Sequence, residues 1–146
     1  MRNVLRKWIP GGWILALGIL LVAGCGGSGR KPVFTVRGKV LTADKKPAAG
    51  ALVTFHPVAA APKDTERPSG HVDEQGNYQL TTYLENDGAP AGDYAVTIVW
   101  PVPRKTPFEP EGPDRLGGKF ARPETSPHMF TVKPRPDQDL PAITLP

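Results

Sequence analysis

Proline is the feature that most limits the fold of this chain. Of its 18 prolines, only Pro10 lies within the first 24 residues. A proline ring removes a backbone donor and breaks the interior of a helix. No segment beyond residue 24 shows helical periodicity with capping residues. The sequence therefore predicts an all-β domain.

Alternating apolar and polar residues support that prediction, because a strand with one buried face repeats every two residues. Three segments alternate clearly, and the residues of their inner parity are Phe34, Val36 and Val40; Ala51, Val53 and Phe55; and Tyr94, Val96, Ile98 and Trp100. Ala95 and Thr97 fall on the outer parity. Weaker runs occur at 70–73, 78–83, 130–133 and 143–145. About seven short strands are expected, which is typical of a β-sandwich, here over residues 33–146.

Two glycines mark special backbone positions. Gly38 falls on the inner parity of its strand, which predicts a bulge or a close backbone contact. Gly76 lies in the turn cluster 73–77, where a tight hairpin needs a residue with positive φ.

The N-terminal segment has the layout of a secretory signal. Arg2, Arg6 and Lys7 form a cationic head, and an apolar run from 13 to 22 follows. Val22-Ala-Gly-Cys25 ends the run and resembles the lipobox of bacterial lipoprotein signals. The resemblance implies cleavage after residue 24, a lipid on Cys25 and a Gly/Ser-rich tether over 25–32. A permanent membrane helix would need about 20 consecutive apolar residues; it remains an alternative, as does an ordinary signal cut elsewhere.

Charge and cysteine content narrow the partners of the mature chain. Three of the 18 Lys and Arg lie in the signal, so the rest nearly balance the 14 Asp and Glu. A nucleic-acid partner is therefore not expected. The single cysteine is assigned to the lipid, so no disulfide is available to stabilise the domain.

Residues 101–127 form a long segment rich in proline and charge, in which Phe108, Leu116 and Phe120 are the candidate packing anchors. Loops of this length usually carry function or lack order. One interpretation is a loop packed across a sheet edge through Leu116 and Phe120, which protects that edge. The other is a binding loop, whose polar contacts would be Asp114, Arg115, Lys119 and Arg122.

Three parts of the chain resemble carboxypeptidase regulatory-like domains, which are related to transthyretin-like sandwiches. The segments are 36–55, with Gly38 and Pro47 among the matching positions, 73–78 and 91–96. The whole arrangement also resembles small bacterial lipoproteins that carry one such domain. The resemblance implies a seven-stranded, Ig-like or transthyretin-like sandwich, and it implies no established activity.

Groups suited to catalysis are few. His56 and His71 fall on outer parities and His128 begins a strand, so all three are expected to be solvated. They share no short ligand spacing, and no serine lies in a nucleophile elbow. We expect no catalytic residue, metal site or cofactor. The alternative is a metal-dependent enzyme using His56, His71 and His128, or a transthyretin-like hydrolase.

That hydrolase branch acts on 5-hydroxyisourate and carries a C-terminal Tyr-Arg-Gly-Ser tail, whereas this chain ends Ala-Ile-Thr-Leu-Pro146. The favoured function is thus a non-catalytic envelope module that is anchored in a membrane by lipid and binds a protein or polysaccharide. A pure spacer remains open. Gly26 follows the lipidated cysteine where aspartate signals inner-membrane retention in some bacteria, so the outer membrane or cell surface is favoured.

Overall fold

The computed structural model describes residues 29–59 and 66–146, so the predicted signal, Cys25 and most of the predicted tether lie outside the described residues. The described chain is all-β, as predicted. Its strands are β1 (Val33–Phe34), β2 (Val36–Thr42), β3 (Leu52–Pro57), β4 (Ser69–His71), β5 (Asn77–Gln79), β6 (Ala89–Pro90), β7 (Gly92–Val99), β8 (Met129–Val132), β9 (Gln138–Asp139) and β10 (Ile143–Leu145). A single 3-10 turn, η1 (Pro123–Thr125), is the one helical element among the described residues.

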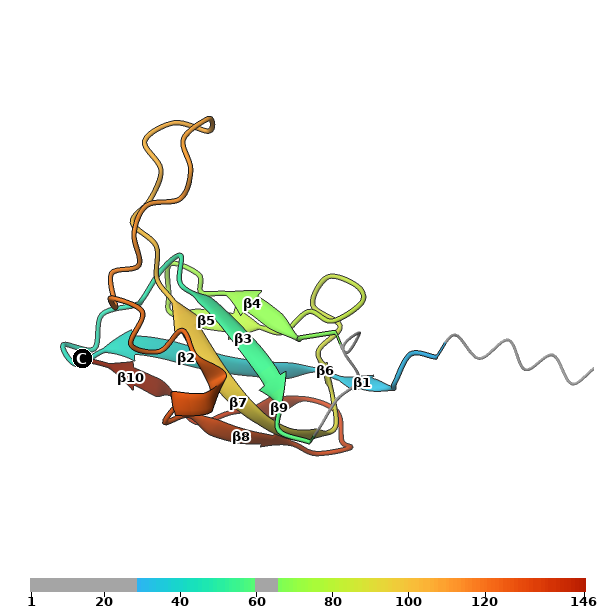
Figure 1. Ribbon diagram of the computed structural model, residues 1–146. Helices are drawn as coiled ribbons and strands as arrows, with labels where there is room; N and C mark the ends of the chain where they lie inside the picture. Colours follow the sequence, from blue (N-terminus) through green and yellow to red (C-terminus); the bar gives the residue numbers. More distant parts are fainter. Residues whose placement is uncertain (1–28, 60–65) are drawn as a thin grey trace, which may run out of the picture. The chain divides into compact units, whose positions relative to one another are not determined.

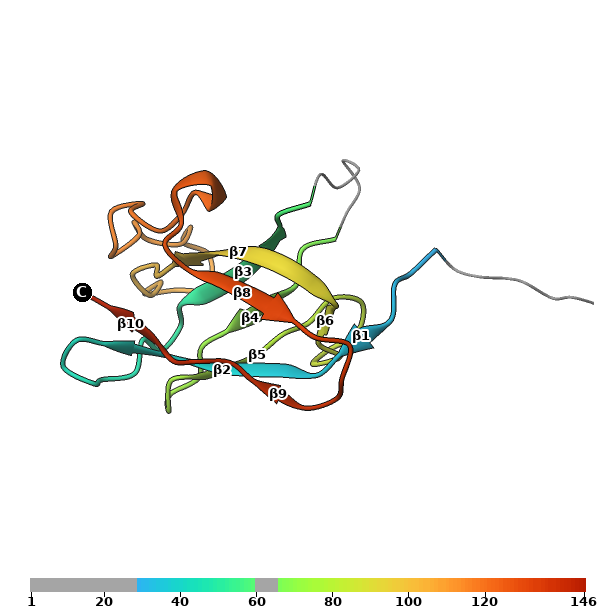
Figure 2. The ribbon, with the colours of Figure 1, turned by 90° about the horizontal axis from the view of Figure 1, so that it is seen from below.

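Two four-stranded sheets pack face to face as a sandwich (Figures 1 and 2), and β1 pairs with β6 in a separate two-stranded sheet. One sheet has the order β4-β3-β7-β8 and is antiparallel throughout. In the other, β2 pairs antiparallel with β5 and parallel with both β9 and β10. All seven predicted strands are present, and the structure adds the two-residue strands β1, β6 and β9.

The core lies between the two sheets and contains most residues of the predicted inner parity, although Phe34 and Trp100 are only half-buried. Val36, Val40, Val53, Phe55 and Ile98 are fully buried. The Phe55 ring lies 5.6 Å from the ring of Tyr94 and 6.2 Å from that of Phe130. Each buried side chain of this size stabilises the fold by about 1.5–3 kcal/mol. Strand β8 is thereby joined to the core by an aromatic stack as well as by backbone pairing.

Strand β7 differs from its prediction, because it is buried on both faces. Ala95 and Thr97 were expected on a solvated face, yet they are 8% and 5% exposed. Strand β7 is central in its sheet, and η1 packs against it. The covering residues lie far along the chain, so the local pattern did not reveal them.

Both special glycines behave as predicted. A Cβ built on Gly38 would lie 2.4 Å from the Tyr78 hydroxyl, which confirms a close contact in place of a bulge. Gly76 has φ of +85° in the 73–77 turn. No helix among the described residues has the length and apolar character needed to cross a membrane.

Candidate functional site

Beyond β7 the chain leaves the sandwich as a long projecting loop, 101–118. In Figures 1 and 2 this loop leaves from the end of the sandwich away from β1. Its two arms continue the pairing of a hairpin. Arg115 N–H donates to Trp100 O at 2.8 Å, and Val102 N–H donates to Pro113 O at 3.0 Å. Gly112 allows the arms to approach, because a Cβ there would lie 2.8 Å from Val102.

The tip of the loop, residues 103–111, ends in a tight turn. Glu109 N–H donates to Thr106 O at 3.3 Å, which places Pro107 and Phe108 at the two central positions. Proline suits the first central position because its ring fixes φ. Lys105 N–H also donates to the Glu109 carboxylate at 3.2 Å. The Phe108 side chain at the corner of this turn is 97% exposed.

Asp114 holds the base of the loop. Its carboxylate accepts the N–H groups of Trp100 at 2.8 Å, Leu116 at 3.1 Å and Gly118 at 2.9 Å. Burial alone raises the pKa of Asp114, but these three backbone donors outweigh that effect, so the pKa lies below its ordinary value. Asp114 is therefore an ionised clamp that joins the end of β7 to the returning arm.

An aromatic contact also fixes the base. The Trp100 indole Nε1 donates to Ala49 O at 2.9 Å, which ties it to the β2–β3 connection. The Arg115 guanidinium lies 4.8 Å from the centre of the same indole, a cation–π distance. Arg115 thus covers Trp100 and keeps its own side chain close to the base.

The returning segment covers the edge of β7 beyond the end of β8. Phe120 is 6% exposed and its carbonyl accepts Ile98 N–H at 2.9 Å, while Leu116 packs partly buried on the core. The Ser126 hydroxyl donates to Val96 O at 2.5 Å. The predicted edge-covering loop is thereby confirmed for residues 116–126, whereas the tip stays in solvent.

Of the four predicted binding residues, Asp114 and Arg115 lie at the base of the loop, and Lys119 and Arg122 lie in the returning segment. Asp114 is occupied by backbone donors and Arg115 by Trp100. The Lys119 ammonium lies 5.5 Å from the Phe120 ring centre. Arg122 is exposed just before η1. Phe108 was a candidate packing anchor, but it lies exposed at the tip, where the Thr106-Pro107 turn signal places it.

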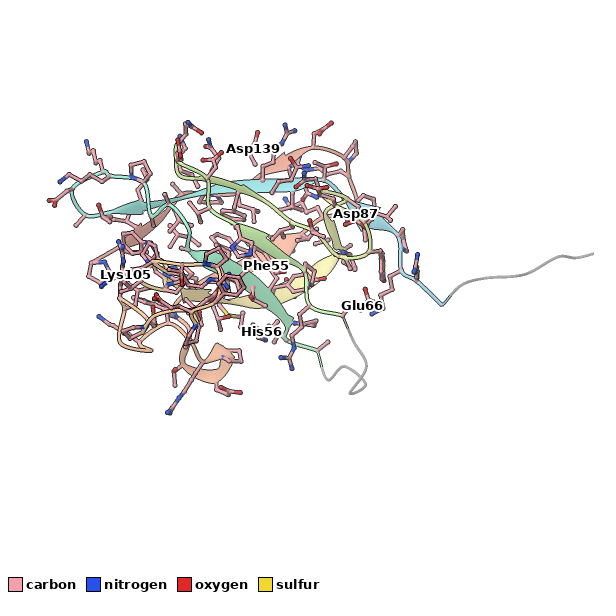
Figure 3. The ribbon with its side chains drawn as sticks, turned by 90° about the horizontal axis from the view of Figure 1, so that it is seen from above. Phe55, His56, Glu66, Asp87, Lys105 and Asp139 are labelled. Carbon is pink, nitrogen blue, oxygen red and sulfur yellow. The ribbon has the colours of Figure 1, made fainter. Side chains whose placement is uncertain are left out.

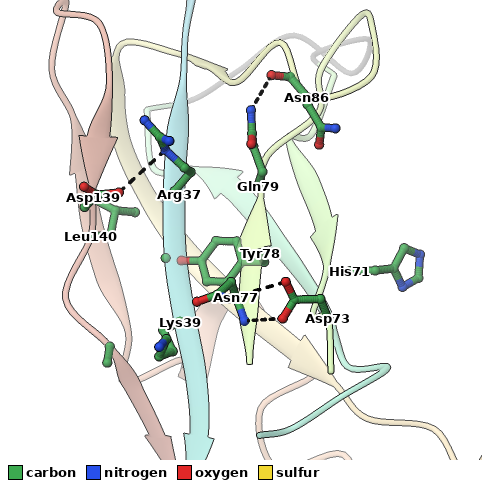
Figure 4. A pocket seen from close by; sticks show the side chains of 12 residues that line it. Arg37, Lys39, His71, Asp73, Asn77, Tyr78, Gln79, Asn86, Asp139 and Leu140 are labelled. Atoms are coloured by element: carbon green, nitrogen blue, oxygen red, sulfur yellow. Dashed lines mark hydrogen bonds and ion pairs between the residues drawn. The ribbon is translucent and has the colours of Figure 1, made fainter. Parts of the chain in front are cut away.

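A groove of about 550 Å³ lies over the sheet that contains β2 and β5, with Arg37, Lys39, His71 and Asn77 among its lining residues (Figure 4). The Arg37 guanidinium pairs with Asp137 at 2.8 Å and Asp139 at 3.6 Å.

Tyr78 also contributes to the lining of the groove. Its hydroxyl is buried and has no hydrogen-bond partner among the described residues, and burial raises its pKa. Most of the lining residues have polar side chains, and no sequence signal predicted the groove.

Two of the three histidines are less solvated than predicted. The His56 Nε2 lies 2.9 Å from the Thr97 hydroxyl. His128 stacks on Phe120 at 5.7 Å, with Nε2 buried and unpartnered among the described residues. Burial lowers the pKa of both rings, with Arg67 adding to the effect at His56. Only His71 is exposed as expected. Residues 29–59 and 66–146 contain no cluster of three His, Cys, Asp or Glu suited to a metal ion.

Comparison with known proteins assigns the chain to no family. No protein-family model and no curated protein matches the chain. Among solved structures, the chain is similar to a 9R-lipoxygenase from Cyanothece PCC8801, with a TM-score of 0.42 and 13% identity. The match covers 79% of this chain and 17% of the lipoxygenase, so the chain spans less than a fifth of that protein. Similarity at this level bears on neither fold nor activity.

Proposed function

We propose that this chain is a non-catalytic binding module of the cell envelope, anchored by a lipid on Cys25, which uses loop 101–118 to bind a protein or polysaccharide. The observation that carries the proposal is the loop itself. Its base is held by the Asp114 clamp, while Phe108 at its tip is 97% exposed. A rigid scaffold with a protruding loop is a common arrangement for recognition.

The position of the loop on the sandwich supports the same proposal. Residues 25–32 lead directly into β1, and the loop leaves from the opposite end of the sandwich (Figures 1 and 2). Figure 3 likewise places Lys105 of the loop and Asp87 at opposite ends. Within the described domain, the loop therefore lies far from β1, the strand that follows the predicted tether. We propose the outer membrane or the cell surface as the location of the protein.

Lipid attachment is tested by growing cells that express the full chain with an alkyne fatty acid. The wild-type chain should incorporate the label and sediment with membranes, and Cys25→Ala should do neither, because the thiol is the attachment point. Density fractionation of the labelled membranes then reports which membrane holds the protein. Equal labelling of Cys25→Ala would disprove the anchor.

Binding is tested by crosslinking the full lipidated chain in cells, followed by mass spectrometry. The matched variant carries a Gly/Ser linker in place of residues 103–111, which leaves the Val102–Pro113 hydrogen bond and the Asp114 clamp in place. A partner that is captured by the wild-type chain and lost with the tip supports the module. A crosslinking pattern that the linker does not change favours a spacer and contradicts the proposal.

A further inference from the structure

We propose that Phe108 is the anchor of a protein–protein contact and inserts into an apolar pocket of the partner. This inference rests on the proposed function, since it names the residue and the class of partner for the same loop. Phe108 is the most exposed of the large exposed hydrophobic side chains in the described residues, at 97%. The next is Leu84, at 69%, which lies in a different loop.

The tip holds Phe108 in a defined place. Pro107 precedes it inside the Thr106–Glu109 turn, and the Glu109 carboxylate accepts Lys105 N–H across the same turn at 3.2 Å. Pro103 and Pro110 restrict the backbone on either side. A segment ordered before binding loses little conformational entropy when it binds. An exposed aromatic on such a frame has the properties of an interface anchor.

The chemistry of the tip favours a protein over a polysaccharide. Phenylalanine carries no group that can hydrogen-bond a sugar hydroxyl. A lone ring on a protruding turn also provides no concave site for a glycan. Protein interfaces, in contrast, are built around single aromatic side chains that fill pockets and are surrounded by a polar rim.

The charges of the tip provide such a rim and argue against a lipid surface. Arg104 and Lys105 precede the turn, and Glu109 and Glu111 follow it, so the tip is balanced in charge. Attraction to anionic lipids needs a surplus of cations, and the two glutamates remove it. Mixed charge around an apolar centre instead selects a partner with a complementary pattern.

A second copy of this chain does not offer the required pocket in its groove. The groove over β2 and β5 is lined mainly by residues with charged and amide side chains, together with Tyr78, Leu140 and Ala142. Burying a phenyl ring there would displace water from polar groups without replacing their hydrogen bonds. The pocket that accepts Phe108 is therefore assigned to a different protein.

The test places photoreactive benzoylphenylalanine at position 108 of the full lipidated chain in cells. The control carries the same amino acid at position 84, also exposed and apolar but in another loop. The protein crosslinked from position 108 alone is identified and purified, and its affinity is measured for the wild-type chain, Phe108→Ala, Phe108→Leu and Leu84→Ala.

We expect Phe108→Ala to weaken binding about 30-fold or more, as for other central aromatic anchors. Phe108→Leu should retain most of the affinity because it still fills an apolar pocket, and Leu84→Ala should bind like the wild-type chain. Circular dichroism should report the same fold for all variants.

The contrary outcomes separate the two proposals. If Phe108→Ala binds within threefold of wild type while the 103–111 linker abolishes binding, the anchor is wrong and the binding module stands. If the linker variant also binds normally, both the Phe108 anchor and the binding module are contradicted. Phe108-dependent retention on peptidoglycan or on phosphatidylglycerol vesicles, with no protein captured, would replace the protein partner by a glycan or lipid and overturn the inference.

Discussion

Loops 82–88 and 101–118 lie at different ends of the molecule, and in each an aspartate carboxylate accepts three backbone N–H groups. Asp87 accepts the N–H groups of Thr82, Tyr83 and Leu84 at 2.7–2.9 Å, just as Asp114 accepts three at the base of the longer loop. Loop 82–88 then returns to the core at Gly88, whereas loop 101–118 projects into solvent. The same type of aspartate contact thus stabilises a compact turn in one loop and the base of a protruding loop in the other.

The two loops differ in the contacts of the glycines that end their turns. Gly88 is buried, its N–H donates to Leu80 O at 2.9 Å and its carbonyl accepts the Thr82 hydroxyl at 2.6 Å. At the long loop the corresponding turn residues, Gly117 and Gly118, are exposed. Damage to the first loop should therefore destabilise the whole domain, and damage to the second should remain local.

The largest expected difference in stability is between a glycine-to-alanine substitution in one loop and the same substitution in the other. Gly88 has φ of +102°, and a Cβ there would lie 1.9 Å from Phe34 O. Gly88→Ala should lower the free energy of unfolding by about 3 kcal/mol or more, from backbone strain and overpacking. Gly117 has φ of +61° and open space around it, so Gly117→Ala should cost only about 1 kcal/mol. Urea unfolding of both variants measures the two losses in free energy of unfolding. Equal losses would contradict the difference that we expect between the two loops.

Replacing Asp87 or Asp114, the aspartate that holds each loop, should give a smaller difference in stability. Asp87→Ala leaves three amides without their acceptor next to the buried segment 88–90, so a loss of about 1–3 kcal/mol of global stability is expected. Asp114→Ala should change global stability by less, because the turn residues 117 and 118 beside it are exposed, whereas residues 88–90 beside Asp87 are buried. Hydrogen exchange should then accelerate at the three released amides, those of Trp100, Leu116 and Gly118, and not in the core strands. A global loss with Asp114→Ala larger than with Asp87→Ala would reverse our comparison.

The smallest effect should be the response to acid. Burial raises the pKa of each clamp aspartate, yet the backbone donors lower it further, so both pKa values lie below the ordinary 3.8. A carboxyl with a lowered folded pKa stabilises the fold above that ordinary value, and the contribution is lost as pH falls through the lowered one. Stability should therefore decline below about pH 4. Asp87→Asn should flatten the decline more than Asp114→Asn in urea midpoints measured from pH 6 to 3, and a wild-type curve that stays level to pH 3 would contradict it.

The parity of apolar residues predicted the fold well because a strand's inner face is a local property of sequence. It failed at Ala95 and Thr97, where η1 and the neighbouring strands provide cover that no local pattern contains. The long loop was located correctly and partly assigned to the sheet edge. In the alternative interpretation its polar residues would contact a partner, yet the Asp114 carboxylate instead accepts backbone amides. The two glycines that follow Asp114 at 117–118 were the available turn signal.

The pairing of β2 carries a consequence for the timing of folding. Its parallel partner β10 comes from the far end of the described chain, and Ile143 and Leu145 are buried against the core. The β2 sheet therefore cannot close until residues 143–145 are available, and contacts this distant in sequence form slowly. For a chain that is threaded through a membrane before it folds, as the proposed signal implies, late closure would keep the polypeptide unfolded until export has finished.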